Sequence, residues 1–187
     1  NWARNVTASN VAIYEHLKRE AIEHARDSLM GYTLYTNPTY ETGWFNELLC
    51  AELDQFLLDV EAGKSPRLIV QAPPRSGKSE LASRRLPAYT MGKFPKWNII
   101  GTSYSADLAN RMSRDTQRIV KSPQHQDVFP DVLVGSRSNG ALSTAELWET
   151  VDTSGALTGG SYRAAGVGGG ITGQGMNIGV VDDPAKD

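Results

Sequence analysis

The sequence has 187 residues but only one cysteine, Cys50, and three histidines. A single cysteine excludes an internal disulfide and a zinc site of several thiolates, so we expect Cys50 to be a small buried apolar group. His16, His24 and His125 have neither metal-ligand spacing nor a paired nucleophile, which predicts surface or partly buried roles. No apolar run approaches the roughly 20 residues that span a membrane, and residues 1–10 lack a signal-peptide core. We therefore expect a soluble intracellular protein with no membrane partner.

The net charge is only −2, but the charged residues are unevenly distributed. Residues 1–66 contain 5 basic and 10 acidic residues, residues 67–121 contain 11 and 3, and residues 122–187 contain 3 and 8. A basic block of this size typically binds the phosphates of a nucleotide or of nucleic acid, although a solvated helix face is the commoner cause of a charge run. A more specific motif is needed to distinguish phosphate binding from a solvated helix face.

Hydrophobic periodicity divides the chain into two parts near residues 63–66. Apolar residues at helical spacing predict helices over about Val11–Leu29 and over Phe45–Val60, the second ending at Gly63. We therefore expect residues 1–63 to form a helical segment that packs on a core made by residues 64–187.

The second part alternates strands and helices. Apolar runs predict strands at Arg67–Ala72 and Asn98–Thr102, and helices are expected from Gly77 until Pro87 and over Ala106–Lys121. Pro87 should stop or kink the first of these helices, because it removes an i→i−4 hydrogen bond. This order predicts an α/β fold with a parallel sheet and right-handed crossovers. Shorter strands are expected at Glu146–Val151, Ser161–Val167 and Asn177–Val181.

Ten of the 18 glycines lie between Gly155 and Gly179. Glycine costs backbone entropy on folding, so this density is unusual within a core. Gly155–Gly160 could equally be a mobile surface loop, whereas Gly166–Gly175 precedes the last predicted strand and is the better candidate for function.

A phosphate-binding loop, or Walker A motif, follows the first predicted strand. The run Ala72-Pro73-Pro74-Arg75-Ser76-Gly77-Lys78-Ser79 matches its pattern, with Ala72 in place of the first glycine. Backbone N–H groups of such a loop and of the following helix N-terminus form a cradle for phosphate oxygens. Lys78 would reach the β- and γ-phosphates, and Ser79 would offer its hydroxyl to Mg²⁺. The expected phosphate contacts are Pro74, Arg75, Ser76, Gly77, Lys78, Ser79 and Glu80.

The second motif is acidic and follows the last predicted strand. Ile178–Val181 is followed by Asp182 and Asp183, the pattern of a Walker B motif. The motif alone is weak, since acidic residues often cap or turn a strand end. Combined with the phosphate loop, it predicts that Asp182 holds Mg²⁺ and that Asp183 orients or deprotonates the attacking water.

The motifs together resemble the large terminase subunit of tailed bacteriophages and prophages, over about Trp44–Asp187. The resemblance rests on residues 71–79, on residues 102–111 (TSYSADLANR) and on residues 166–175 (GVGGGITGQG) followed by residues 181–186 (VDDPAK). It implies a P-loop NTPase with a RecA-like, additional-strand (ASCE) parallel sheet flanked by helices, here with an N-terminal helical extension.

The resemblance also implies a function. An ATPase of this family uses ATP and Mg²⁺ to translocate double-stranded DNA into a procapsid, without sequence specificity. The implied partners are DNA, a small terminase subunit, the portal protein and further copies of the chain in a ring, in the cytoplasm of an infected bacterial host. The family's nuclease domain has no counterpart up to Asp187, so we expect a core truncated after the Walker B motif and no nuclease activity.

An arginine near the γ-phosphate accelerates many NTPases. Arg75, inside the loop, is the first candidate and could act in cis. Position 174 carries Gln174, where we expect many relatives to have arginine, so a trans-acting arginine is sought at Arg163 and then at Arg111. The last belongs to a basic helical face that is either solvated or in contact with a subunit or DNA and that consists of Arg111, Arg114, Arg118 and Lys121.

The adenine base needs an apolar slot, which the family builds upstream of the phosphate loop. Tyr40, Glu41 and Trp44 are the candidates, and simple packing against the sheet is the alternative. The favoured hypothesis is thus a Mg²⁺-dependent ATPase motor. The alternatives are a nucleotide-binding module without turnover and another P-loop enzyme, such as a helicase-like ATPase or a kinase.

Overall fold

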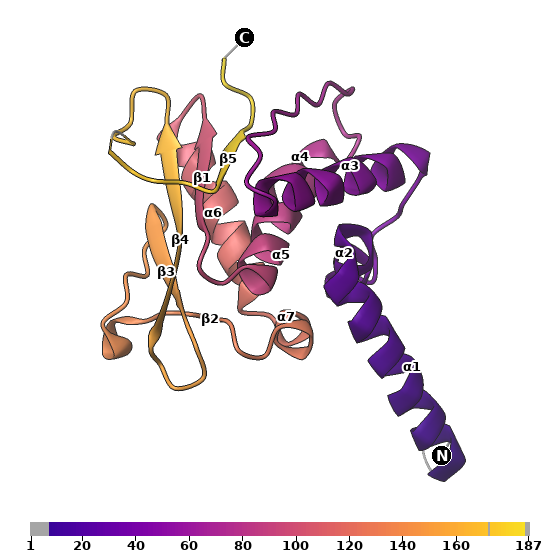
Figure 1. The fold of residues 1–187 in the computed structure, drawn as a ribbon. Helices are drawn as coiled ribbons and strands as arrows, with labels where there is room; N and C mark the ends of the chain where they lie inside the picture. Colours follow the sequence, from indigo (N-terminus) through magenta and orange to yellow (C-terminus); the bar gives the residue numbers. More distant parts are fainter. Residues whose placement is uncertain (1–7, 172, 186–187) are drawn as a thin grey trace.

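A five-stranded sheet and a set of helices make up the computed structural model, which describes residues 8–171 and 173–185 (Figure 1). The helices are α1 (Ala8–Asp27), α2 (Leu29–Thr36), α3 (Trp44–Glu61), α4 (Lys78–Glu80), α5 (Leu86–Lys93), α6 (Ala106–Val120) and α7 (Pro123–Val128). A π-helical turn, η2 (Leu81–Arg85), joins α4 to α5, and η3 (Arg137–Asn139) is a 3₁₀ turn. The strands are β1 (Asn98–Ser103), β2 (Leu133–Val134), β3 (Leu147–Val151), β4 (Leu157–Gly166) and β5 (Ile178–Val181).

The sheet is mixed, so the prediction of a parallel sheet is wrong in part. Its strand order is β2-β3-β4-β1-β5. β1 runs parallel to β4 and to β5, whereas β3 is antiparallel to both β2 and β4. A tight turn joins β3 to β4, in which Asp152 accepts N–H bonds from Ser154 and Ala156, and such a short connection permits only antiparallel neighbours. The hairpin also draws Gly159 and Gly160 into β4, not into a loop.

The strand predicted at Arg67–Ala72 does not form. Residues 64–73 have no regular structure, and Ile69 is 85% exposed. Strands are stabilised by a hydrogen-bonded neighbour, and no other described segment pairs with this one. The apolar run therefore lies as an irregular segment beside the sheet.

Pro87 was expected to stop or kink the helix after the phosphate loop, and it does not stop it. The helix continues to Lys93, with Pro87 as the second residue of α5. The π-helical turn η2 precedes it, and the Leu86 N–H bonds to the Leu81 carbonyl, five residues back. The proline thus changes the helical register instead of stopping the helix.

The N-terminal helices form a separate layer, from which α1 projects (Figure 1). The predicted helix Val11–Leu29 corresponds to α1, which ends at Asp27, whereas α2 was not predicted. The Ser28 side chain lies between the two helices, accepts the Gly31 N–H and caps α2. The Asp54 carboxylate of α3 accepts the Leu29 N–H, which fixes α2 against α3. Cys50 is buried beside it and burial raises the pKa of its thiol to about 12, as expected of an apolar packing residue.

The main core lies between the sheet and α6. The Trp148 ring stacks on Tyr162 at 5.6 Å between centroids, and its indole N–H donates to Ser113 of α6 at 3.0 Å. Ile99 and Ile178 continue this buried face toward β5. Within the described residues, no helix is both long enough and apolar enough to cross a membrane.

Candidate nucleotide site

The predicted phosphate loop is a tight turn that opens a helix. The Ser76 N–H donates to the Pro73 carbonyl, and α4 begins at Lys78. Arg75 (φ 64°) and Gly77 (φ 86°) both adopt the left-handed conformation. Arg75 and Asp183 are the two described non-glycine residues with positive φ, a strained state that concentrates at functional sites.

Asn46 and Tyr40 pack against the phosphate loop. The Asn46 side-chain amide of α3 donates to the Ser76 carbonyl at 2.9 Å. A Cβ atom on Gly77 would lie 2.8 Å from the Asn46 amide nitrogen and 2.9 Å from the Tyr40 hydroxyl, so only glycine fits there. Tyr40 is half-buried and burial raises the pKa of its phenol. Asn46 belongs to no nucleotide motif, and sequence reasoning missed it.

The phosphate loop and the acidic motif meet, although about 100 residues separate them. Lys78 Nζ lies 3.8 Å from Asp183 Oδ1. The Tyr104 N–H, just beyond β1, donates to the Asp183 carbonyl at 3.0 Å and holds this strand end. Asp183 also has φ 45°, and its side chain is 61% exposed toward solvent. A carboxylate in this exposed position would be accessible to substrate as a general base or as a group that orients water.

Asp182 is buried, with 8% of its surface exposed. Its Oδ1 accepts from the Ser79 hydroxyl at 3.3 Å and its Oδ2 from the Ser83 hydroxyl at 2.9 Å. No cationic side chain of the described residues forms an ion pair with it. Buried carboxylates are usually paired with a cation or bound to a metal, so this one is suited to a cation from outside the chain.

Ser79 and Asp182 fit Mg²⁺ better than a metal held by protein groups alone. In the described part of the chain, no three His, Cys, Asp or Glu side chains gather as a ligand set. Mg²⁺ is typically bound by one or two protein oxygens together with nucleotide phosphates. One carboxylate and one hydroxyl beside a phosphate loop match that donor set.

The Glu80 side chain forms ion pairs with two arginines, although a phosphate contact was predicted for this residue. It pairs with Arg85 at 2.8 Å and with Arg84 at 3.5 Å. Arg84 reaches on to Asp115 of α6 at 3.0 Å, and Arg118 pairs with the same carboxylate at 2.9 Å. These ion pairs fasten the helix that carries Lys78 and Ser79 to α6.

Comparison with known proteins identifies the family. The family model for the N-terminal part of the T4-like-virus-type terminase large subunit matches residues 69–187, more than half of the chain. The chain belongs to this terminase family. Its members are associated with phage DNA packaging. Searches among curated proteins and among solved structures found no match.

A cavity of about 450 Å³ flanks the phosphate loop of this terminase chain. It lies between the start of α3 and the residues that precede the loop, with Trp44 and Asn46 on one side and Gln71 to Pro73 on the other. Trp44 is 78% exposed and lines this cavity, whereas Tyr40 lies under the loop. Glu41 is exposed and does not line it. Of the three predicted base contacts, only Trp44 is at the cavity.

The candidate arginines of the terminase chain lie on separate elements. Arg75 is exposed at the tip of the phosphate loop. Arg163 lies in β4 opposite Ile100, and its guanidinium is 3.6 Å from Glu146. Arg111 is exposed on α6. Of the three, only Arg75 belongs to the loop itself.

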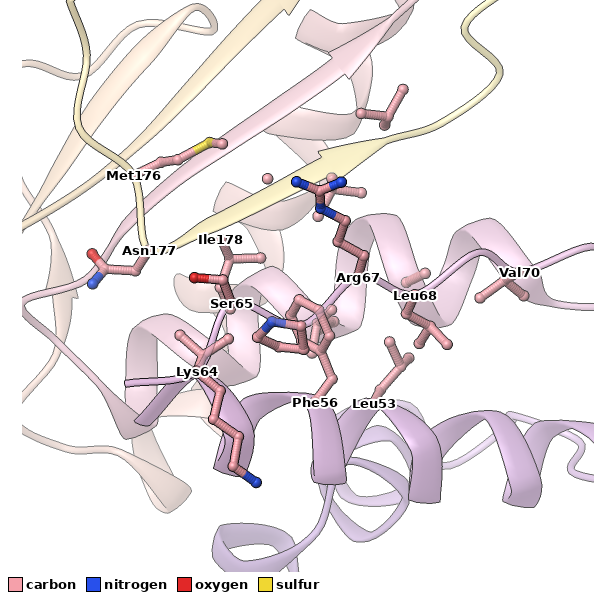
Figure 2. A pocket seen from close by; sticks show the side chains of 17 residues that line it. Leu53, Phe56, Lys64, Ser65, Arg67, Leu68, Val70, Met176, Asn177 and Ile178 are labelled. Carbon is pink, nitrogen blue, oxygen red and sulfur yellow. The ribbon is translucent and has the colours of Figure 1, made fainter. Parts of the chain in front are cut away.

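A second, larger cavity of about 700 Å³ separates β5 from the irregular segment after α3 (Figure 2). Leu53 and Phe56 point into it from α3, while Leu68 and Val70 line one side and Met176 to Val181 the other. Among the described strands β5 pairs only with β1, so its other backbone edge faces this groove. The groove therefore has apolar side chains on its floor and the unpaired backbone edge of β5 along one side.

Proposed function

We propose that the chain is the Mg²⁺-dependent ATPase of a packaging motor that moves double-stranded DNA into procapsids. The observation that carries the proposal is the meeting of Lys78 and Ser79 with Asp182 and Asp183 at one end of the sheet. Such a pairing of phosphate loop and acidic strand end is what phosphoryl transfer to water requires. Membership of the terminase family supports DNA packaging as the process that ATP hydrolysis drives.

Each group has a distinct role in this proposal. Lys78 binds the β- and γ-phosphates as a point charge, and Arg75 neutralises charge on the γ-phosphate in cis. Ser79 and Asp182 would hold Mg²⁺, which neutralises charge on the phosphate oxygens when bound. Asp183, exposed beside Lys78, orients the attacking water and accepts its proton. Trp44, at the flanking cavity, contacts the base.

We also propose that residues 64–187 form a RecA-like, additional-strand core on which residues 1–63 pack. Two observations support this. β5, which ends in the acidic pair, is parallel to β1, and the groove beyond β5 has the apolar floor and free edge that another strand needs. The bond from Asn46 to Ser76 links the helical part to the phosphate loop. A strand placed in this groove would give Arg67–Ala72 the neighbour that it lacks.

Assembly into a ring, with the portal protein and a small subunit as partners in the host cytoplasm, follows from the family role. A ring would let a neighbouring copy supply an arginine, for which Arg163 and Arg111 are the candidates. In that case the rate of ATP hydrolysis per chain rises with protein concentration.

The test is phosphate release from ATP with Mg²⁺, for the native chain and for Lys78→Ala. We expect the substitution to lower the rate at least about a hundredfold, since it removes a charge that acts on the transition state. Lys96→Ala, which removes an exposed lysine before β1, is the matched control and should keep the native rate. Equal rates in the native chain and Lys78→Ala would refute the ATPase.

Asp183→Asn separates binding from turnover. Asparagine has the same shape and tolerates a positive φ, so the strand end should stay intact. We expect ATP affinity within about twofold of native, by calorimetry, and a turnover reduced by about 10² or more because the proton acceptor is lost. ATP binding without release in the native chain would instead indicate a nucleotide-binding module.

A further inference from the structure

Ser83 is a buried hydroxyl at the candidate site that no nucleotide motif includes. It is 2% exposed, and its hydroxyl donates to Asp182 Oδ2 at 2.9 Å. Ser79 of the phosphate loop bonds to the other oxygen of the same carboxylate. Of the two bonds, the one from Ser83 is the shorter and the more buried.

The local helix geometry explains why Ser83 faces Asp182. Residues four apart lie on the same side of a helix, so Ser79 and Ser83 point to the same strand end. Pro87 has no N–H to donate to the Ser83 carbonyl, and its ring would clash with that carbonyl in a regular α-helix. The π-helical turn η2 accommodates Pro87, and π-turns of this kind are frequent at functional sites. The neighbouring Arg84 and Arg85 point away, to Asp115 and Glu80.

We propose that Ser83 is a positioning residue: it holds Oδ2 of Asp182, so that Oδ1 stays turned toward Ser79 and the phosphate loop. A carboxylate with one hydroxyl partner can rotate about its Cβ–Cγ bond, and a second bond from the opposite side fixes the rotation. Groups that orient a metal ligand in this way typically change metal affinity by 10- to 100-fold. This inference rests on the proposed function, because it assigns Ser83 a purpose only if Asp182 holds Mg²⁺ beside a nucleotide.

The test compares ATP affinity with Mg²⁺ and with EDTA, by calorimetry. The readout is the gain in affinity that Mg²⁺ gives, which is independent of turnover. We expect Ser83→Ala to reduce this gain about tenfold and to leave the affinity in EDTA unchanged. Ser83→Cys, which nearly keeps the side-chain volume but donates weakly, should behave in the same way, whereas Ser83→Thr, which keeps the hydroxyl, should retain the native gain.

Ser113→Ala is the matched control. It also removes a buried serine hydroxyl, which accepts from Trp148 in the core between the sheet and α6, and so lowers stability without touching Asp182. It should keep the native Mg²⁺ gain. A native gain in both Ser83→Ala and Ser83→Cys would overturn the positioning role while leaving the ATPase intact. The ATPase itself would fail separately, if Lys78→Ala and the native chain released phosphate at equal rates.

Discussion

Asp182 and Asp183 are neighbours in sequence, but their environments are opposite. Asp182 is 8% exposed and bonded to two hydroxyls, while the Asp183 side chain is 61% exposed beside Lys78. Successive side chains of a strand point to opposite faces, and the positive φ of Asp183 turns the chain further. This separation allows one carboxylate to hold a cation while the other meets water.

His125 is expected to make the stability of the chain depend on pH in the acidic range. It is fully buried, shares a hydrogen bond of 2.7 Å with the Tyr32 hydroxyl, and its Nε2 has no partner among the described groups. Burial lowers the pKa of its imidazole from 6.5 to about 4, so the folded chain binds fewer protons than the unfolded chain in this range. The neutral side chain packs in the interior, deeper than the surface or partly buried position that the sequence predicted.

We expect the free energy of unfolding to fall as the pH drops through this window. The contribution is fully present above pH 6.5 and is lost progressively toward pH 4, by about 3 kcal/mol in all. Urea unfolding at several pH values measures it, with His125→Gln as the comparison, since glutamine does not titrate. Equal pH slopes for the two chains between pH 6.5 and 4 would contradict the assignment.

At the scale of elements, β1 depends on a glycine at its centre. A Cβ atom on Gly101 would collide with the hydroxyl of Tyr162, which is fully buried and stacked on Trp148. Tyr162 cannot move aside without disturbing the core between the sheet and α6. The close approach of β1 to β4 therefore requires glycine here.

Gly101→Ala should destabilise the chain by about 2 kcal/mol, the usual cost of overpacking a core. Urea unfolding followed by tryptophan fluorescence measures the change. Tyr162→Phe should restore part of the loss in the double variant, because it removes the colliding hydroxyl. Gly170→Ala, at a position with open space around the new Cβ, is the control and should shift stability by under about 0.5 kcal/mol. A native stability for Gly101→Ala would show that the strands separate more readily than the structure implies.

Elements with strong local patterns were predicted correctly from the sequence. β1 and α6 are confirmed to within a residue, because apolar runs and helical spacing depend on local residues alone. The strand at Arg67–Ala72 failed, since pairing depends on a neighbour that no local pattern reveals. The acidic pair and the phosphate loop were proposed as a site from their motifs, whereas the contacts of Asn46 and Ser83 could not be predicted, because they arise only from the tertiary structure.

At the scale of the whole molecule, the basic residues of the middle third divide into paired and free groups. Arg84 and Arg118 are held by Asp115. Arg111 and Arg114 are exposed on α6, and neither forms an ion pair with a described residue. Free guanidinium groups on one helix are suited to the phosphate backbone of DNA.

We expect Arg111→Ala with Arg114→Ala to weaken binding of double-stranded DNA, independently of its sequence. Each lost phosphate contact should reduce the slope of log affinity against log salt by about 1. Fluorescence anisotropy over a salt series measures this, and Arg137→Ala with Lys96→Ala, which also removes two exposed positive charges but away from α6, is the charge-matched control. An unchanged slope in the double variant would leave α6 as a solvated face.

The free edge of β5 also has a consequence for handling the protein. Val181 at this edge is 66% exposed, and an unpaired strand edge is a template for a second strand. Two copies at high concentration can therefore join edge to edge across their grooves, and such pairs would scatter light and sediment as dimers without being motor rings. A charged side chain in place of Val181 would protect the edge and keep concentration series on ATP hydrolysis free of this association.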